Sequence, residues 1–366
     1  MIKAFFLAIL MVIVSLASMY ASQPEYVVIE TENPAFRANT VFSEPEDLTS
    51  ERFEIILKRY GLNKIVDGED DEFARILLLR NWLNGYLVRD RSRPVENRDV
   101  LGMLEQGPRG GRFSCGHFEA VQSAVLNAMG YVTRCVLSGP EGTEARLTGS
   151  HGSNEVWCNS LCKWVMVDAE HDCHFEKNGM PLSALELREA GLADGGQGVV
   201  RVRGPEREPQ DWGRHDQWGN TPKSYGFISW RLQANRFSLW PDKVSSVEVV
   251  YNDEFFKQNT WHKNGKKHWA YDSGNFLRVD NRSEIYWTPN VLMLDVDISG
   301  VVALVKIKSC TPNLREYQIK REGGGWESVE NSTSLELSRP SEEFAFRSVN
   351  LAGVTGPVYK LLIERK

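Results

Sequence analysis

The sequence predicts an α+β fold followed by an all-β domain, and three observations support this. Residues 50–90 carry apolar side chains at helical spacing. Residues 155–158 and 163–168 are short apolar runs, typical of paired strands. From about residue 291, short alternating runs are separated by Gly, Pro and Asn, as in a small antiparallel sandwich. A chain of 366 residues is also long for one domain, so we expect two folded units.

The composition is that of an ordinary globular protein, with 42% hydrophobic and 25% charged residues. It supplies enough apolar side chains for a core that needs no disulfides. The formal net charge of −6 argues against nucleic acid as a main partner, because phosphate binding depends on a basic surface.

Residues 1–22 predict a secretory signal peptide. Lys3 precedes a wholly apolar run over residues 4–14, and small residues follow. The run is too short to span a bilayer comfortably, so we expect no stable membrane anchor after the signal is removed. A secreted or periplasmic location is therefore expected.

Two helices are expected within residues 50–90. The first covers residues 52–60 and ends near Gly61, and the second runs from Asp70 to Leu87. Acidic residues cluster at the start of the second helix, where the helix dipole favours negative charge. A calcium-binding loop is the alternative, but the acidic run lacks the spacing of that motif and its late Glu.

A third helix is expected to begin at Cys115. Phe118, Val121 and Val125 lie on one apolar face, and Gly130 ends the helix. A helix N-terminus favours the thiolate, which is the form of cysteine that attacks a carbonyl group. A backbone N–H at the same turn could stabilise the resulting oxyanion. The alternative is a buried, unreactive cysteine.

His151 and Asp168 are expected to meet across a β-hairpin. A two-residue loop at 159–160 sets His151 directly opposite Asp168. The imidazole could then donate one N–H to Asp168 and turn its other nitrogen to Cys115. A shift of one residue would put the two side chains on opposite faces of the sheet, so the prediction depends on the turn.

A nucleophile at a helix start, a base and a residue that orients the base form a site for nucleophilic acyl transfer. Four segments resemble, in the same order, segments of the transglutaminase-like superfamily: residues 111–120 (GRFSCGHFEA), 128–134 (AMGYVTR), 151–157 (HGSNEVW) and 164–168 (WVMVD). The resemblance implies a papain-like core with Cys115 as nucleophile, His151 as base and Asp168 as the residue that orients the base. Residues 345–356 resemble the last hairpin of fibronectin type III and other immunoglobulin-like domains.

The chain accordingly divides into four parts: a signal peptide (1–22), a transglutaminase-like catalytic domain with N-terminal helices (23–240), a connecting aromatic-rich segment (241–290) and an immunoglobulin-like sandwich (291–366). The aromatic side chains of the connecting segment, Trp261, Trp269 and Trp287 among them, could contact sugar or peptide. Packing between the two domains would explain them equally well.

Three positions depart from the usual residues of the family. Residues 116–117 are Gly-His where animal transglutaminases have Trp-Val, residues 152–153 are Gly-Ser where many members have Ala-Trp, and residues 169–170 are Ala-Glu where Pro-Thr is common. The calcium sites of the animal enzymes cannot be identified in this sequence. Gly116 opens the side of the thiol that an aromatic residue would close, which favours water over an amine as the acyl acceptor.

We therefore expect a secreted cysteine enzyme that acts on the amide bonds of a protein, peptide or glycopeptide substrate through a thioester at Cys115. Hydrolysis is favoured over cross-linking, and no cofactor is expected. Two alternatives remain open. One is a binding or scaffold protein with an inactive triad, and the other is a glycan- or cell-wall-directed amidase, suggested by the aromatic-rich segment.

Several other polar residues leave alternatives open. Cys158 and Cys162 could form a bridge or be buried thiols, since a zinc half-site would lack a second half at usable spacing. His171 and His174 could bind a metal or make hydrogen bonds near Asp168. Gln106 is a candidate oxyanion donor. No metal site is predicted.

Overall fold

The structure is a computed structural model that describes residues 25–43, 45–139, 151–211, 225–238, 247–258, 262–263, 266–267 and 276–366. The expected signal peptide, residues 1–22, lies outside these ranges, as do Trp261 and Trp269. Within the ranges, every helix is either too short or too polar to cross a membrane.

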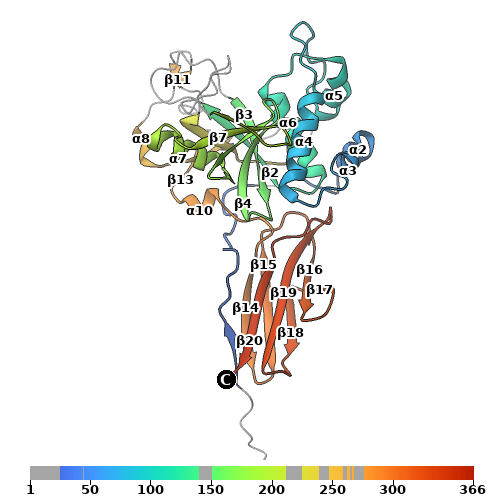
Figure 1. Cartoon of the computed structure of the whole chain (residues 1–366), viewed down its shortest axis with the longest axis vertical. Coiled ribbons are helices and arrows are strands. Elements are labelled where there is room, and N and C mark those ends of the chain that lie inside the picture. The colour runs from blue at the N-terminus through green and yellow to red at the C-terminus, as the bar shows by residue number, and fades with distance from the viewer. Residues whose placement is uncertain are drawn as a thin grey trace, which may run out of the picture.

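A ten-stranded sheet forms the centre of the larger unit (Figure 1). Its strands lie in the order β13-β10-β9-β2-β3-β4-β5-β7-β8, and β6 pairs with β5. Neighbouring strands are antiparallel except for β10 and β13. The strands are β2 (Thr133–Gly139), β3 (His151–Cys158), β4 (Lys163–Asp168), β5 (Cys173–Lys177), β6 (Met180–Pro181), β7 (Val199–Arg203), β8 (Glu208–Asp211), β9 (Phe227–Arg231), β10 (Glu248–Tyr251) and β13 (Phe276–Val279). A separate hairpin joins β11 (His262–Lys263) to β12 (Lys266–Lys267).

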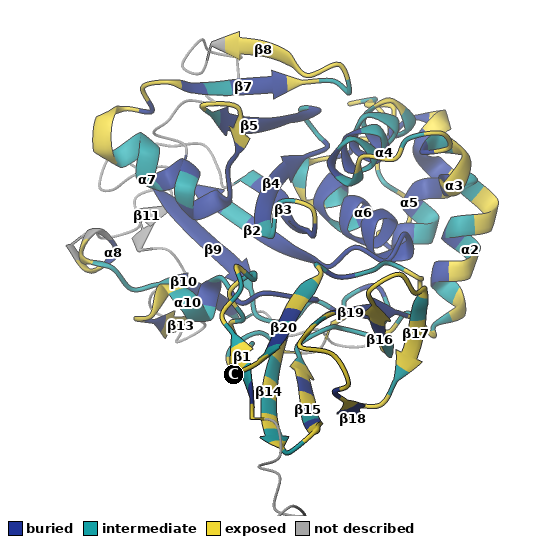
Figure 2. Cartoon of the chain, turned by 60° about the horizontal axis from the view of Figure 1, so that its bottom comes forward, coloured by how far each residue is buried: buried dark blue, intermediate teal, exposed yellow. Residues whose placement is uncertain are grey.

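Helices cover both faces of this sheet because its central strands are apolar on both sides. In β4, Val165 and Val167 pack with the N-terminal helices, whereas Met166 packs in the opposite cluster with α7. The helices are α2 (Glu51–Tyr60), α3 (Leu62–Ile65), α4 (Glu72–Tyr86), α5 (Val100–Gln106), α6 (Cys115–Ala128) and α7 (Ala184–Asp194), with the shorter η1 (Gly107–Arg109), α8 (Glu254–Gln258) and α10 (Arg282–Ile285). Figure 2 shows α6 buried between the other N-terminal helices and the sheet.

The first helices begin and end where the local sequence predicts. The carboxylate of Asp71 accepts a hydrogen bond from the Ala74 backbone N–H at 2.7 Å and so caps α4. The acidic run therefore lies at a helix start. Gly61 ends α2 in the left-handed conformation, with φ of 62°, which glycine adopts without strain.

A buried ion pair holds the centre of the sheet together. The Arg134 guanidinium donates to the Glu155 carboxylate at 2.7 Å and lies 4.2 Å from the centre of the Trp164 ring. Glu155 also accepts hydrogen bonds from the Trp230 indole at 2.6 Å and from the backbone of Ala184, the first residue of α7, at 2.7 Å. Removing one member would leave a buried charge unpaired, so β2, β3, β9 and α7 depend on this pair.

The smaller unit is a sandwich of two antiparallel sheets. One has the order β1-β20-β19-β16-β17 and the other β14-β15-β18. Apolar side chains of both sheets form one core, which includes Val305 and Leu335 from one sheet and Phe346 and Ile363 from the other. The strands are β1 (Tyr26–Ile29), β14 (Leu292–Ser299), β15 (Val302–Ser309), β16 (Leu314–Arg321), β17 (Trp326–Val329), β18 (Ser332–Glu336), β19 (Ser341–Asn350) and β20 (Tyr359–Arg365).

Two segments lie in units to which the sequence division did not assign them. The strand β1 pairs with β20, next to the C-terminus, although residues 23–240 were assigned to the catalytic domain (Figure 1). The strands β10 and β13 extend the ten-stranded sheet, although residues 241–290 were expected to connect the two domains. Short strands that pair with distant partners have no local signature, which explains both differences.

The two units are in direct contact where α6 ends. The Asn350 side chain donates to the Gly130 carbonyl at 2.8 Å. A Cβ atom at Gly130 would lie only 2.6 Å from that of Ala352, so this contact requires a glycine. The sandwich is therefore packed against the larger unit.

All six cysteines lie in the described ranges, and none forms a disulfide. Burial raises the pKa of Cys158 to about 12, and its sulfur lies 3.2 Å from the Ser160 hydroxyl. Of the two alternatives for Cys158, a bridge or a buried thiol, the structure shows the buried thiol. The bridge to Cys162 is not formed.

Candidate active site

Cys115 is the first residue of α6, as the sequence predicts. The preceding turn is fixed by His117, whose Nδ1 accepts a hydrogen bond from the Ser114 backbone N–H at 3.0 Å. This capping role explains why His117 does not join the site. Cys115 is half-buried.

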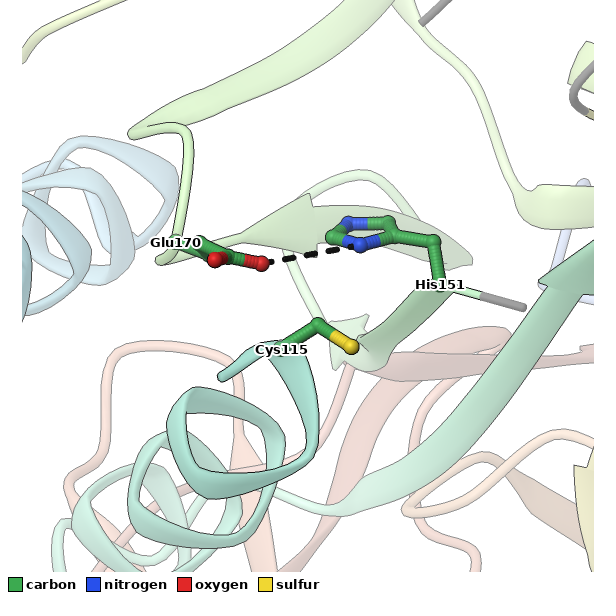
Figure 3. Close-up of side chains that lie close together, drawn as sticks. All are labelled: Cys115, His151 and Glu170. Atoms are coloured by element: carbon green, nitrogen blue, oxygen red, sulfur yellow. Dashed lines mark ion pairs between the residues drawn. The ribbon is translucent and has the colours of Figure 1, made fainter. Parts of the chain in front are cut away.

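Gly152 allows α6 to start close to β3. A Cβ atom at this position would lie 2.9 Å from a carboxylate oxygen of Glu119 and 3.6 Å from the backbone of Cys115. A side chain at this position would therefore have to displace the Glu119 carboxylate. This close approach brings the Cys115 thiol to His151, the first residue of β3 (Figure 3).

His151 and Asp168 lie on the same face of the hairpin, as predicted, but the register of the two strands differs from the prediction. Cys158 lies opposite Lys163, so the turn spans residues 159–162 rather than two residues, and it is closed by the Cys162 N–H, which donates to the Asn159 carbonyl at 3.2 Å. His151 is therefore not directly opposite Asp168 but two positions further along. A shift of two residues keeps both side chains on one face, where diagonal neighbours can still meet.

The His151 imidazole is held between a carboxylate and the thiol. Its Nε2 lies 2.7 Å from Asp168 Oδ2, and its Nδ1 faces Cys115 and Glu170 (Figure 3). The side chain of Asp168 is 2% exposed, whereas that of His151 is 21% exposed. The carboxylate is therefore sealed in the protein while the imidazole remains accessible to a substrate.

His171 is a second partner of Asp168. Its Nδ1 lies 2.8 Å from Asp168 Oδ2, its backbone N–H donates to Oδ1 at 3.1 Å, and its ring centre lies 4.9 Å from that of His151. The sequence left open whether His171 binds a metal or makes hydrogen bonds, and in the structure it makes hydrogen bonds. His174 lies elsewhere, buried between Arg80 and Glu176.

The charges of the site stabilise one another. Burial of the imidazole opposes its protonation, but Asp168 and then Cys115 outweigh burial and hold the pKa of His151 well above its usual value. Burial likewise opposes the ionisation of Asp168, yet His151 and His171 hold the pKa of that carboxyl well below its usual range. The site therefore favours a protonated imidazole beside an ionised carboxylate.

Glu170 lies in the site, and the sequence analysis noted it only as a departure from the family. Its Oε2 is 3.7 Å from His151 Nδ1, on the side of the ring that faces Cys115 (Figure 3). Asn84 of α4 fixes this turn by donating to the carbonyls of Ala169 at 2.8 Å and of Glu170 at 3.0 Å. The period of two along a strand would have placed Glu170 on the face of Asp168, which is the signal that could have identified it.

Gln106 does not serve as an oxyanion donor in this structure. Its side-chain N–H groups donate to the carbonyls of Pro94 at 2.9 Å and Gly110 at 3.1 Å, and its side-chain oxygen accepts from the Glu96 backbone at 3.0 Å. Gln106 instead fixes the loop that precedes Cys115. By contrast, a Cβ atom at Gly116, the residue that follows the thiol, would have open space around it, with no atom beyond its chain neighbours and the backbone of its own helix within 4 Å.

Comparisons with known proteins give structural neighbours only. The chain matches no protein-family model and no curated protein. One neighbour is a protein from Cytophaga hutchinsonii assigned as a cysteine protease, at 11% identity and a TM-score of 0.26, covering 34% of this chain and 39% of its own. Another is red sea bream transglutaminase, at 12% identity and a TM-score of 0.29, covering 92% of this chain and 61% of its own. The chain thus spans less than two thirds of either neighbour.

Proposed function

We propose that this chain is a transglutaminase-like cysteine enzyme that forms a thioester between Cys115 and the acyl group of an amide substrate. One observation carries the proposal: a thiol at a helix start faces one nitrogen of His151, while the other nitrogen lies 2.7 Å from Asp168. This order of nucleophile, base and orienting carboxylate is what acyl transfer through a covalent intermediate requires.

The reaction follows from the charges of these three residues. The Cys115 thiolate attacks the carbonyl carbon, and the carbonyl oxygen takes the negative charge. The first N–H groups of a helix lack acceptors within the helix, so those at the start of α6 could stabilise this oxyanion. When the intermediate collapses, the C–N bond breaks and the leaving amine takes a proton from the His151 imidazolium. Water, deprotonated by His151, then cleaves the thioester and regenerates the thiolate.

We propose hydrolysis rather than cross-linking as the outcome. Transfer to an amine requires a walled channel that keeps water from the thioester. The open space beside Gly116 supports the opposite outcome, because nothing within 4 Å of that position would exclude water.

A protein, peptide or glycopeptide is the proposed substrate, and a secreted or periplasmic location is proposed from residues 1–22. The alternative of a glycan-directed amidase depended on the aromatic-rich segment. Trp287 is buried, and its ring centre lies 5.7 Å from that of Trp164. This aromatic residue therefore packs in the interior and does not offer a surface for a sugar. An immunoglobulin-like identity of the sandwich remains part of the proposal.

The test is turnover of a glutamine-bearing protein in the presence of a labelled primary amine. We expect more glutamine residues to be hydrolysed to glutamate than to take up the label with the intact chain, and neither product with Cys115→Ala. Cys162→Ala is the matched control, because Cys162 is also a half-buried thiol but lies at the hairpin turn. More labelled amide than glutamate would contradict hydrolysis, and turnover by Cys115→Ala would contradict the nucleophile.

An inactive binding protein is distinguished by thiol reactivity alone. In the proposed enzyme, iodoacetamide alkylates Cys115 faster than an ordinary thiol, and His151→Ala slows the reaction. Equal alkylation rates in the parent and in His151→Ala would support the binding function instead.

A further inference from the structure

We propose that Cys115, His151 and Glu170 form a binding site for a zinc ion, which closes the thiol to substrate when it is occupied. The blocking of activity rests on the proposed function, but the binding of zinc does not. Nothing in the acyl-transfer chemistry requires Glu170, so its position beside the thiol and the imidazole calls for a separate explanation.

The ligand atoms lie close to the spacing of a zinc site. The Cys115 sulfur, a His151 ring nitrogen and a Glu170 carboxylate oxygen all lie within 4.8 Å of one another (Figure 3). The imidazole nitrogen, Nδ1, is 3.7 Å from Glu170 Oε2. In a tetrahedral zinc site with bonds of about 2.0–2.3 Å, neighbouring ligand atoms lie about 3.3–3.6 Å apart. Small side-chain movements would therefore be enough.

The combination of donors selects zinc over the common hard cations. A thiolate and an imidazole suit zinc, whereas calcium and magnesium take oxygen ligands. Three protein ligands leave the fourth position of the tetrahedron for water. Zinc binds the thiolate and the unprotonated imidazole nitrogen, so its binding releases protons.

The residues behind the ligands are already in place for a metal. Zinc-binding imidazoles usually donate their other N–H to a carboxylate, which fixes the ring, and Asp168 does this for His151 at 2.7 Å. The backbone of Glu170 is held by Asn84 at 3.0 Å and by the Arg89 side chain. The side chains of His151 and Glu170 are 21% and 17% exposed, so an ion can reach them from solvent.

A neighbouring trio, His151, Asp168 and His171, also has three donor atoms within 4.8 Å of one another. Its atoms are already hydrogen-bonded directly, at 2.7 Å and 2.8 Å to the same carboxylate oxygen. An ion there would have to break both bonds. In the trio that contains Glu170, the imidazole nitrogen and the carboxylate oxygen are 3.7 Å apart, so an ion between these two atoms breaks no hydrogen bond between them.

Cobalt(II), a spectroscopic substitute for zinc, tests the site without any substrate. We expect one cobalt ion per chain, a near-ultraviolet sulfur-to-cobalt absorption band, and loss of that band when zinc is added. Cys115→Ser should abolish the band. Glu170→Gln should weaken zinc binding at least about 10-fold in competition with a coloured indicator. Cys162→Ser and Glu189→Gln, a thiol and a carboxylate away from the site, are the matched controls and should bind as the parent does.

A second measurement covers the case in which Cys115→Ser does not fold. Zinc should protect Cys115 of the intact chain from iodoacetamide, and the protection should need at least about 10-fold more zinc in Glu170→Gln. A cobalt band that persists in Cys115→Ser, or equal zinc affinity in Glu170→Gln and the parent, would overturn the site. Both results are obtained without turnover, so a failure of the proposed enzymatic activity would be seen separately.

Discussion

The proposed mechanism pairs a Cys115 thiolate with the His151 imidazolium, and replacing Asp168 by Asn should remove most of this ion pair at mildly acidic pH. The isosteric amide keeps the shape of the buried side chain but loses the charge that favours the imidazolium. Asp168 is hydrogen-bonded to His151 at 2.7 Å and is 1% exposed, so the interaction is poorly screened. A hydrogen bond to a charged group contributes about 1.5–3 kcal/mol. At about 1.4 kcal/mol per factor of ten, the ion pair becomes about 10- to 150-fold less populated relative to the neutral pair.

The assay is the rate constant for alkylation of Cys115 by iodoacetamide between pH 5 and 9, followed by mass spectrometry with a chelator present. At pH 6 an ordinary thiol, with a pKa of about 8.5, is almost wholly protonated, so rapid alkylation reports the ion pair. We expect the rate at pH 6 to fall about 10- to 150-fold in Asp168→Asn. The two rates should converge above pH 8.5, where an ordinary thiol is largely ionised.

Asp253→Asn is the control for loss of stability. Asp253 pairs with Arg188 at 2.7 Å, outside the site, so its replacement should leave the alkylation rate unchanged. Equal rates at pH 6 in folded Asp168→Asn and the parent would refute the view that Asp168 maintains the imidazolium.

Three further predictions concern stability. Because its pKa is raised in the folded protein, protonated His151 contributes to the free energy of unfolding. This contribution is complete below the pKa of the unfolded chain, about 6.5, and is lost as the pH rises through the pKa of the folded protein. His151→Asn should therefore flatten the fall of Tm on the alkaline side, and a pH profile of Tm like that of the parent would contradict this. Glu155→Gln should lower the free energy of unfolding by about 3–5 kcal/mol in denaturant, because Arg134 would remain buried and charged; a loss below about 1 kcal/mol would show that the pair is solvated. Gly130→Ala should lower the free energy of unfolding by about 1–3 kcal/mol more than Gly68→Ala does, since both glycines have a positive φ but only a Cβ at Gly130 would contact Ala352. Equal losses in the two variants would show that backbone strain alone accounts for them.

Local patterns were sufficient to predict the elements that carry the site. The helix that starts at Cys115 follows from an apolar face that ends at Gly130, and the face shared by His151 and Asp168 follows from the period of two along a strand. The register was missed because a four-residue turn and a two-residue turn place the same residues on the same face. Only the hydrogen bond of Cys162 to Asn159 distinguishes the two turns.

Other features depend on contacts between distant segments and could not be obtained from local patterns. The strand β1 has four residues and takes its partner from the far end of the chain. Glu170 follows the end of β4, and hydrogen bonds from the distant side chains of Asn84 and Arg89 fix the turn that carries it into the site. Gln106 was a candidate oxyanion donor without a local motif to support it, and its hydrogen bonds hold the preceding loop instead.

The central claim is that Cys115 carries the acyl group of an amide substrate. The most direct measurement is intact-mass and peptide-level mass spectrometry after acid quenching of a reaction with an amide-bearing peptide that the protein turns over. The account predicts an adduct of the acyl mass on Cys115 that hydroxylamine removes, and no adduct in Cys115→Ala. Turnover that proceeds with the adduct on another residue, or in Cys115→Ala, would contradict it.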